Sequence, residues 1–237
     1  MVRHKRACCL ATTVLACLAA LTPGPALAHG HYEVDDAELI DPRSCEAEIW
    51  YTRFDDGDHA TFLSPTCRRD GNFQLTGTVG FLRGSGEGGE LYGIEGKTML
   101  VDPDSRGYGL GLVAGAEYLT ADSRWETVFA YVPFSMTLIP DRAVFHANLG
   151  VERDRGEDDA TALTWGVATE ATLAGPLGLV AEVFGDDRSG SHPVMQIGPR
   201  LFLIEDRLSL DLTYTRELGG DNEEAYTISA SLLVVNF

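Results

Sequence analysis

Nine charged residues at alternate positions of apolar segments are the residues best suited to chemistry. Seven are acidic and two are basic, and all nine share the parity of small polar neighbours; they are Glu46, Glu48, Glu95, Lys97, Glu117, Glu170, Glu182, Arg200 and Asp211. If they line a water-filled pore, they favour cations or neutral solutes over anions. The alternative is that Glu95, Glu117 and Glu182 pair with Lys97 and Arg200 across the interior and fill it.

The residues that must be positioned lie in segments that alternate between apolar and polar side chains. In the stretch NFQLTGTVGF at residues 72–81, odd positions are apolar and even positions are polar or glycine. This period of two is typical of a strand whose faces meet different media. Twelve such segments follow one another, at about 45–54, 59–67, 72–82, 90–101, 107–118, 125–137, 143–151, 161–172, 176–185, 193–203, 207–217 and 225–237.

The connections between these segments alternate between short turns and longer or more charged loops, as in an up-and-down sheet. The polar face is rich in Gly, Ser and Thr, whereas the apolar face carries large side chains that would not fill a cylinder of twelve strands. We therefore predict an all-β fold, a closed up-and-down antiparallel transmembrane β-barrel of about 12 strands with lipid outside and water inside. A soluble periplasmic barrel with the faces reversed is the alternative.

The ends of the chain carry targeting signals. Residues 1–28 combine a basic start, an uncharged run and Ala26-Leu27-Ala28, which predicts a cleaved signal peptide. We assign residues 29–44 to an N-terminal periplasmic segment and residues 45–237 to the barrel. The final strand ends on Phe237, which resembles the C-terminal signal that the outer-membrane insertion machinery recognises. Along this strand the apolar residues change from even to odd positions, which predicts a bulge near Ser231.

Charge and cysteine content narrow the class further. The net charge of -18 repels phosphate backbones and argues against a nucleic-acid partner. Cys45 and Cys67 are the cysteines outside the signal peptide, and pairing of the first two strands places them opposite one another, which predicts a disulfide. Aromatic residues near strand ends predict a membrane-interface girdle; they are Tyr51, Tyr92, Tyr108, Tyr118, Trp125, Tyr131 and Tyr214.

Two histidine-containing patterns suggest other chemistry. After cleavage, the free amine and His31 of the sequence His29-Gly30-His31 can hold Cu(II) or Ni(II) in a square plane, although an accidental sequence at the cleavage site is the simpler explanation and the one we favour. His146 and Asn148 are similar to the strand-borne His and Asn of outer-membrane phospholipases. A hydrolase also needs an activated serine. No serine lies two places from His146, and parity turns the pair toward the lumen, so we expect hydrogen bonding in the lumen, no enzyme activity and no cofactor.

Several longer stretches resemble a proteobacterial family of outer-membrane barrels. They are VDDAELIDPRSCEAEIWYTR at 34–53 with Cys67, YGIEGKTML at 92–100, FHANLGVER at 145–153 and LVAEVFGDD at 179–187. Members are labelled transporters or putative proteins of the meta-pathway of phenol degradation. The resemblance covers most of the mature chain and its motifs are structural, so it implies a channel or uptake role without naming a solute.

The sequence therefore predicts a monomeric passive channel for small solutes in the outer membrane of a Gram-negative bacterium. Its other expected partners are membrane lipid and lipopolysaccharide, because acidic loops such as 152–159 can gather bridging divalent cations. A barrel that does not conduct and serves as a structural or interaction platform is the first alternative, and a membrane hydrolase is the second.

Overall fold

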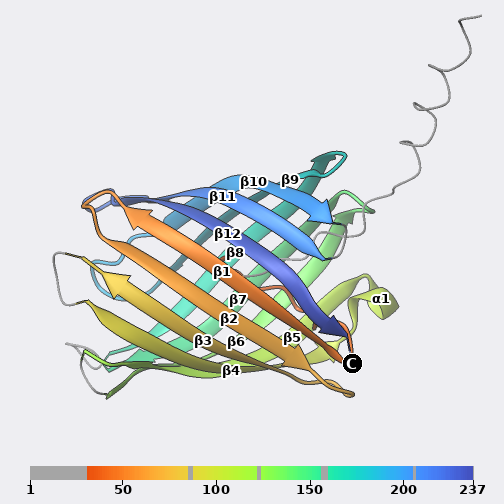
Figure 1. The fold of residues 1–237 in the computed structure, drawn as a ribbon, viewed down its shortest axis with the longest axis horizontal. Coiled ribbons are helices and arrows are strands. Elements are labelled where there is room, and N and C mark those ends of the chain that lie inside the picture. The colour runs from red at the N-terminus through yellow and green to blue at the C-terminus, as the bar shows by residue number, and fades with distance from the viewer. Residues whose placement is uncertain (1–30, 85–87, 122–123, 156–159, 205–206, 237) are drawn as a thin grey trace, which may run out of the picture.

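The structure is a computed structural model, and it describes residues 31–84, 88–121, 124–155, 160–204 and 207–236. Its strands form one closed barrel, seen from the side in Figure 1. The strands are β1 (Ser44–Phe54), β2 (His59–Arg68), β3 (Gln74–Arg83), β4 (Gly89–Val101), β5 (Tyr108–Leu119), β6 (Arg124–Ile139), β7 (Ala143–Asp154), β8 (Thr161–Ala174), β9 (Leu177–Asp186), β10 (Val194–Ile204), β11 (Leu208–Glu217) and β12 (Glu224–Asn236).

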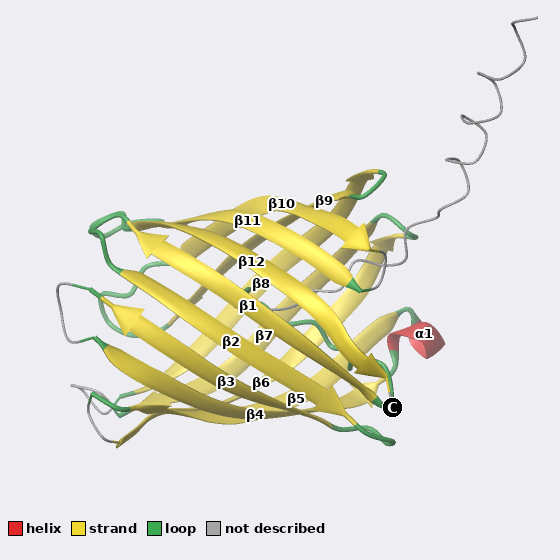
Figure 2. Ribbon diagram, in the orientation of Figure 1, coloured by secondary structure: helices red, strands yellow, loops and turns green. Residues whose placement is uncertain are grey.

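Each strand pairs antiparallel with its neighbour in the sequence, and β1 pairs with β12 to close the sheet. This order confirms the predicted up-and-down barrel of twelve strands. Closure leaves no strand edge without a hydrogen-bonding partner, which hydrocarbon would not tolerate. In the described residues, helical structure is limited to α1 (Pro103–Arg106), between β4 and β5 (Figure 2). None of these residues forms a helix long and apolar enough to cross a membrane.

The alternation read from the sequence separates the two faces of the sheet as predicted. On β3 and the turn before it, Phe73, Leu75 and Phe81 are between 43% and 55% exposed on the outside of the barrel. Gln74, on the opposite parity, is 7% exposed and faces the interior. Leu212 and Ile228, on β11 and β12, are each 56% exposed. A continuous surface of large apolar side chains on a closed barrel is suited to lipid and not to water.

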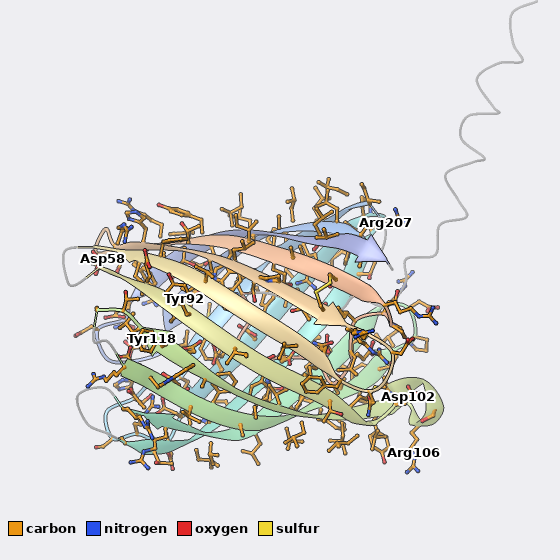
Figure 3. All side chains as sticks on the ribbon, turned by 60° about the horizontal axis from the view of Figure 1, so that its bottom comes forward. Asp58, Tyr92, Asp102, Arg106, Tyr118 and Arg207 are labelled. Atoms are coloured by element: carbon orange, nitrogen blue, oxygen red, sulfur yellow. A yellow bond between two sulfur atoms is a disulfide. The ribbon has the colours of Figure 1, made fainter. Side chains whose placement is uncertain are left out.

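The two ends of the barrel differ less than the sequence suggests. We call the end where β2 ends and β3 begins the turn end; β1 also begins there and β12 ends there. The opposite end, where β1 ends and β2 begins, is the loop end. Figure 3 shows Asp102, Arg106 and Arg207 at the turn end and Asp58 at the loop end. Connections such as 55–58 are as short as those of the turn end, so the expected contrast in length is only partial.

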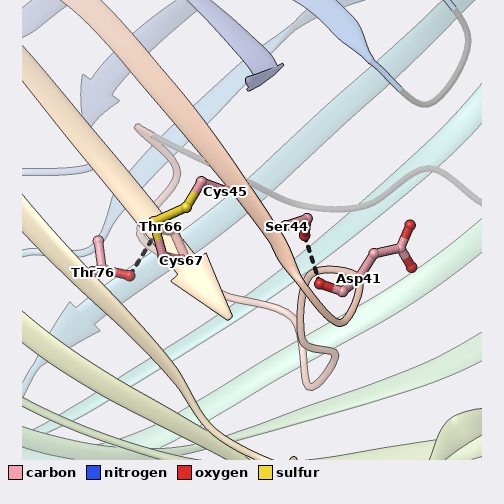
Figure 4. Close-up of a disulfide and its surroundings, with 6 residues drawn as sticks. All are labelled: Asp41, Ser44, Cys45, Thr66, Cys67 and Thr76. Carbon is pink, nitrogen blue, oxygen red and sulfur yellow. Dashed lines mark hydrogen bonds between the residues drawn. A yellow bond between two sulfur atoms is a disulfide. The ribbon is translucent and has the colours of Figure 1, made fainter. Parts of the chain in front are cut away.

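The predicted disulfide joins the first two strands at the turn end (Figure 4). Cys45 and Cys67 are direct partners in the register of β1 and β2, and their Cα atoms lie 4.1 Å apart. Beside them, a hydrogen bond of 2.8 Å joins the hydroxyls of Thr66 and Thr76 on the inner face. The disulfide therefore fixes the point where the chain enters the barrel wall.

The bulge expected near Ser231 lies elsewhere. Tyr226, Ile228, Leu232 and Val234 are all exposed, so even positions keep facing outward past Ser231. The register between β1 and β12 shifts between Cys45 and Glu46, whose partners are Val235 and Leu233. The extra residue is thus at Val234, where the strand is about to end. Phe237, the expected signal for insertion, lies outside the described residues.

Candidate functional site

The interior of the barrel holds a segment of the chain itself, residues 31–43, which we call the N-terminal strap. Val34, Ala37 and Ile40 in this segment are between 0% and 5% exposed. The sequence predicts that residues 29–44 lie in the periplasm, but residues 32–40 lie inside the barrel and contact the inner face of its strands. Apolar side chains at a spacing of three residues explain the difference, because the barrel shields them from water.

Polar side chains of the wall bind the backbone of the strap. The two carboxylate oxygens of Glu182 accept hydrogen bonds from the amides of Glu33 (3.1 Å) and Val34 (3.0 Å). Further along, the amide of Ala37 donates to Ser135 Oγ at 2.8 Å. The amide of Ile40 donates to Gln74 Oε1 at 2.9 Å, and Arg68 donates to its carbonyl at 2.7 Å. The extended backbone therefore finds hydrogen-bond partners inside the barrel, as buried backbone groups require.

An ion-pair cluster holds the middle of the strap. Lys97 Nζ on β4 lies 3.0 Å from Asp35 Oδ1 and 2.9 Å from Asp36 Oδ1, and both Lys97 and Asp36 are at most 3% exposed. Tyr131 donates a hydrogen bond of 3.3 Å to the second oxygen of Asp35. Tyr131 thus faces the lumen and does not belong to the predicted aromatic girdle. Tyr51, Tyr92 and Trp125 of that set are exposed on the outside of the barrel.

The beginning of the strap rests on a second charged cluster, formed by β8, β10 and β11. Arg200 pairs with Glu170 (2.9 Å) and with Asp211 (2.7 Å) across the sheet, and all three side chains are buried. The ring of Tyr32 lies 5.1 Å from the centre of the Arg200 guanidinium, at cation–π distance, and its hydroxyl donates to Asp211. The expected pairing of Arg200 and Lys97 with Glu95, Glu117 and Glu182 is therefore not the one found.

His31 is next to this cluster. Its Nε2 lies 3.1 Å from the Thr213 hydroxyl, and its ring contacts Tyr32. Burial lowers the pKa of the His31 imidazole to about 4, and the Arg200 charge acts in the same direction against the opposing effect of Asp211. His29, the other residue of the predicted metal site, lies outside the described residues. Within them, no group of three or more His, Cys, Asp or Glu side chains is arranged to hold a metal ion.

His146 and Asn148 both face the strap. Asn148 forms two hydrogen bonds with the backbone of Asp35, at 2.8 and 2.9 Å, when its carboxamide is oriented to satisfy both groups. His146 Nδ1 lies 2.8 Å from Ser135 Oγ, and its Nε2 lies 3.8 Å from Glu170 Oε1. A serine therefore does lie beside His146, across the β6 and β7 pair, which local spacing did not reveal.

This Ser135, His146 and Glu170 set contains the residue types of a nucleophilic triad, but its surroundings argue for a structural role. Ser135 and His146 are each 2% exposed, and the Ser135 hydroxyl accepts the Ala37 amide of the strap. Neither residue lines either of the two interior cavities described below. A substrate carbonyl would have no approach to Ser135 Oγ while the strap covers it.

A glycine makes room for the strap at its closest approach to β8. A Cβ atom at Gly166 would lie 2.5 Å from Val34 Cγ2, well inside van der Waals contact. Gly109 on β5 plays a similar part, because a Cβ there would meet the Ala37 methyl group at 3.0 Å. These glycines read as ordinary strand residues in the sequence, and at each of them the strap makes the closest contact with the position that a side chain's first carbon atom would take.

Two adjoining cavities remain between the strap and the wall. The larger, about 550 Å³, reaches the loop end at Ser191 and His192. The smaller, about 180 Å³, follows β1 to β4 past Ser64 and Thr66 to Gln74, the first residue of β3 at the turn end. Five residues line both cavities and mark where they meet: Tyr32, Glu95, Glu117, Phe129 and Tyr131.

The remaining predicted lumen residues are distributed along these spaces. Glu48 lines the smaller cavity. Glu46 accepts a hydrogen bond from the Ser231 hydroxyl near the turn end.

Sequence analysis does not single out several residues of the interior, namely Tyr32, Glu33, Asp35, Asp36, Ser135 and Gln74. The signal that would have found the strap is the spacing of Val34, Ala37 and Ile40 between acidic residues, together with Lys97, a lone base on its strand.

The fold defines a closed twelve-stranded β-barrel of the outer-membrane type, and the strap occupies part of its interior. The model of one protein family, described as "Uncharacterised conserved protein UCP029691", matches residues 16–233. The chain therefore belongs to this family. No curated protein matches the sequence. The label of the phenol-degradation family, which the resemblance implied, stays a prediction.

Solved structures with a similar fold include porins and an outer membrane channel. One is titled "KdgM porin", with 8% identity, a TM-score of 0.65, and coverage of 80% of this chain and 99% of that one. A second is the COG4313 outer membrane channel from Pseudomonas putida F1, with 8% identity, a TM-score of 0.61, and coverage of 86% and 100%. The NanC porin is a third, with 9% identity, a TM-score of 0.61, and coverage of 81% and 100%. At these identities the likeness shows the fold alone.

Proposed function

We propose that this protein is a monomeric passive channel for small solutes in the outer membrane of a Gram-negative bacterium, selective for cations and neutral compounds over anions. The observation that carries the proposal is the pair of adjoining polar cavities, which together run beside the strap from the loop end as far as Gln74, the first residue of β3. Solutes pass along the wall of β1 to β4, where Ser64, Thr66, Thr76 and Thr78 supply hydroxyl groups.

Selectivity follows from the charges that face this path. Glu95 and Glu117 line both cavities, whereas the ammonium of Lys97 is already held by Asp35 and Asp36. Carboxylates in a narrow pore attract cations and repel anions. The turn end faces the periplasm, as short connections do in barrels of this kind. The channels and porins that share the fold support the assignment to the outer membrane.

Current recordings in planar bilayers test the channel. Protein whose insertion is verified by a heat-dependent gel shift should give discrete current steps, and under a KCl gradient the reversal potential should show K⁺ preferred over Cl⁻. The double variant Glu95→Gln, Glu117→Gln should lower this preference, whereas Glu223→Gln, on an exposed loop, should leave it unchanged. Inserted protein without current steps would refute the channel in favour of the non-conducting barrel.

A further inference from the structure

The lining of the larger cavity contains more acidic than basic side chains. Five carboxylates line it: Glu33, Glu95, Glu117, Glu152 and Asp186. At the rim, Arg188 forms ion pairs with Glu152 and Asp186. In the part of the chain that the structure describes, the deeper Glu33, Glu95 and Glu117 form no ion pair.

The three unpaired carboxylates come from separate elements that surround the same space. Glu33 extends from the strap, Glu95 from β4 and Glu117 from β5. The Glu33 side chain is exposed inside the barrel, so a solute in the cavity can reach its carboxylate. A cation bound there would be attracted by the carboxylates of all three elements.

Aromatic rings lie beside these carboxylates. The rings of Phe129 and Tyr131 are stacked with centroids 6.0 Å apart, and both residues line the cavity. Tyr32 and Phe184 also line it, from the strap and from β9. Ring faces attract cations through the quadrupole of the π-system, and carboxylates attract them by charge. The same cavity thus offers both kinds of contact to one ligand.

Size and spacing decide between the kinds of cation. The cavity of about 550 Å³ lies in the range of small-molecule sites, roughly 300 to 1,000 Å³. A bare metal ion needs several ligands within about 2.5 Å of it, and among the described residues no such group of acidic, His or Cys side chains exists. A neutral aromatic molecule would leave three carboxylates without a counter-charge.

We propose that the larger cavity is a binding site for a small organic ammonium ion, whose positive charge meets Glu33, Glu95 and Glu117 and whose carbon groups meet Phe129 and Tyr131. The inference rests on the proposed channel, since it names the class of solute that the channel selects. The ion enters from the loop end past His192 and reaches the junction with the smaller cavity, where Glu95 and Glu117 border both spaces.

Isothermal titration calorimetry on the detergent-purified mature protein tests the site with benzyltrimethylammonium chloride. We expect saturable binding that persists at constant ionic strength in excess Na⁺, and no binding of benzoate or benzyl alcohol, which keep the ring and lose the cation. Glu117→Gln should weaken binding about tenfold, the loss expected for a contact with a charged partner. Phe129→Leu should weaken it about threefold, and Glu223→Gln should leave it unchanged.

The outcomes separate the site from the channel. Any one of four results overturns the site. These are no binding by the wild type, loss of binding in Na⁺ of equal ionic strength, equal binding of benzyl alcohol, and full affinity in Glu117→Gln. The wild-type comparison of three probes does not depend on whether any variant folds. Bilayer recordings on the same preparation report on the channel alone, so current steps without binding refute only the site, and binding without current steps refutes only the channel.

Discussion

Replacement of Lys97 by methionine should release the strap. Lys97 Nζ makes the two ion pairs, to Asp35 and Asp36, that hold the middle of the strap, and it is 3% exposed. The variant leaves Asp36, 1% exposed, as a buried carboxylate without its counter-charge. Removing one partner of a buried ion pair costs about 3 to 5 kcal/mol.

This cost acts on the equilibrium between the docked and the released strap, since a released strap returns both aspartates to water. Each 1.4 kcal/mol is a factor of ten, so the ratio of released to docked strap should rise by about two to three and a half orders of magnitude. In planar bilayers the variant should show a higher conductance level, for a larger share of the time, than the wild type. Methionine keeps most of the length of the lysine side chain, so loss of packing contributes little.

Arg43→Met is the matched control, because Arg43 also pairs with an aspartate, Asp70, at 2.9 Å. That pair is 64% and 78% exposed, and an exposed pair contributes at most about 1 kcal/mol. Its conductance should stay close to that of the wild type. If Lys97→Met conducts like Arg43→Met, with both variants inserted, the ion pairs do not hold the strap and the reasoning is wrong.

Three further predictions concern the strap and its anchor. Gly166→Val should displace the strap and raise the conductance, because a Cβ atom at this position would lie 2.5 Å from Val34 Cγ2. Gly77→Val is the control and should not raise the conductance, because the space around its Cβ is open. Equal currents from the two variants would contradict the contact between Gly166 and the strap. The docked strap holds the His31 imidazole in its neutral form, because its pKa is lowered from 6.5 to about 4. Docking of the strap is therefore fully stable above about pH 6.5 and weakens as the pH falls toward 4. The conductance of the wild type should rise over this pH range, and that of His31→Asn should rise less. Replacing Cys45 and Cys67 by serine opens a loop of 22 residues and should lower stability by about 3 kcal/mol, read as a lower melting temperature in detergent; an unchanged temperature would count against this estimate.

The barrel could be predicted from the sequence because a strand reports its surroundings locally. Alternate side chains point to opposite faces, so Phe73 and Leu75 against Gln74 already indicate two media. Twelve such segments in a row, joined by short connections, are compatible with only a few arrangements of strands in a sheet. The register of β1 and β2 follows from the same alternation, so the pairing of Cys45 with Cys67 could be predicted. The bulge at Val234 could not be predicted, because the ends of strands carry too few residues to fix a register.

The strap could not be placed from the sequence because its contacts are all long-range. Glu33 meets Glu182, and Ala37 meets Ser135, across separations of 149 and 98 residues. No local period reports such contacts, and an acidic segment next to a cleavage site looks like a solvated linker. Likewise Ser135 and His146 become neighbours only through the register of β6 and β7, so spacing along the chain was the wrong measure.

If the protein conducts as proposed, the strap should also determine the charge of the lumen, because of where the barrel wall carries its bases. In the described part of the chain, Lys97 and Arg200 are the buried lysine and arginine side chains. Arg200 pairs with the wall residues Glu170 and Asp211, whereas Lys97 is paired by the strap. Docking therefore covers a wall cation and adds Glu33 to the larger cavity. Displacing the strap through Gly166→Val should raise conductance and lower cation preference together, because Lys97 is exposed and Glu33 leaves. Lys97→Met should raise conductance with a smaller loss of preference, because no cation is uncovered. If the two variants show the same selectivity, the strap narrows the channel without setting its charge.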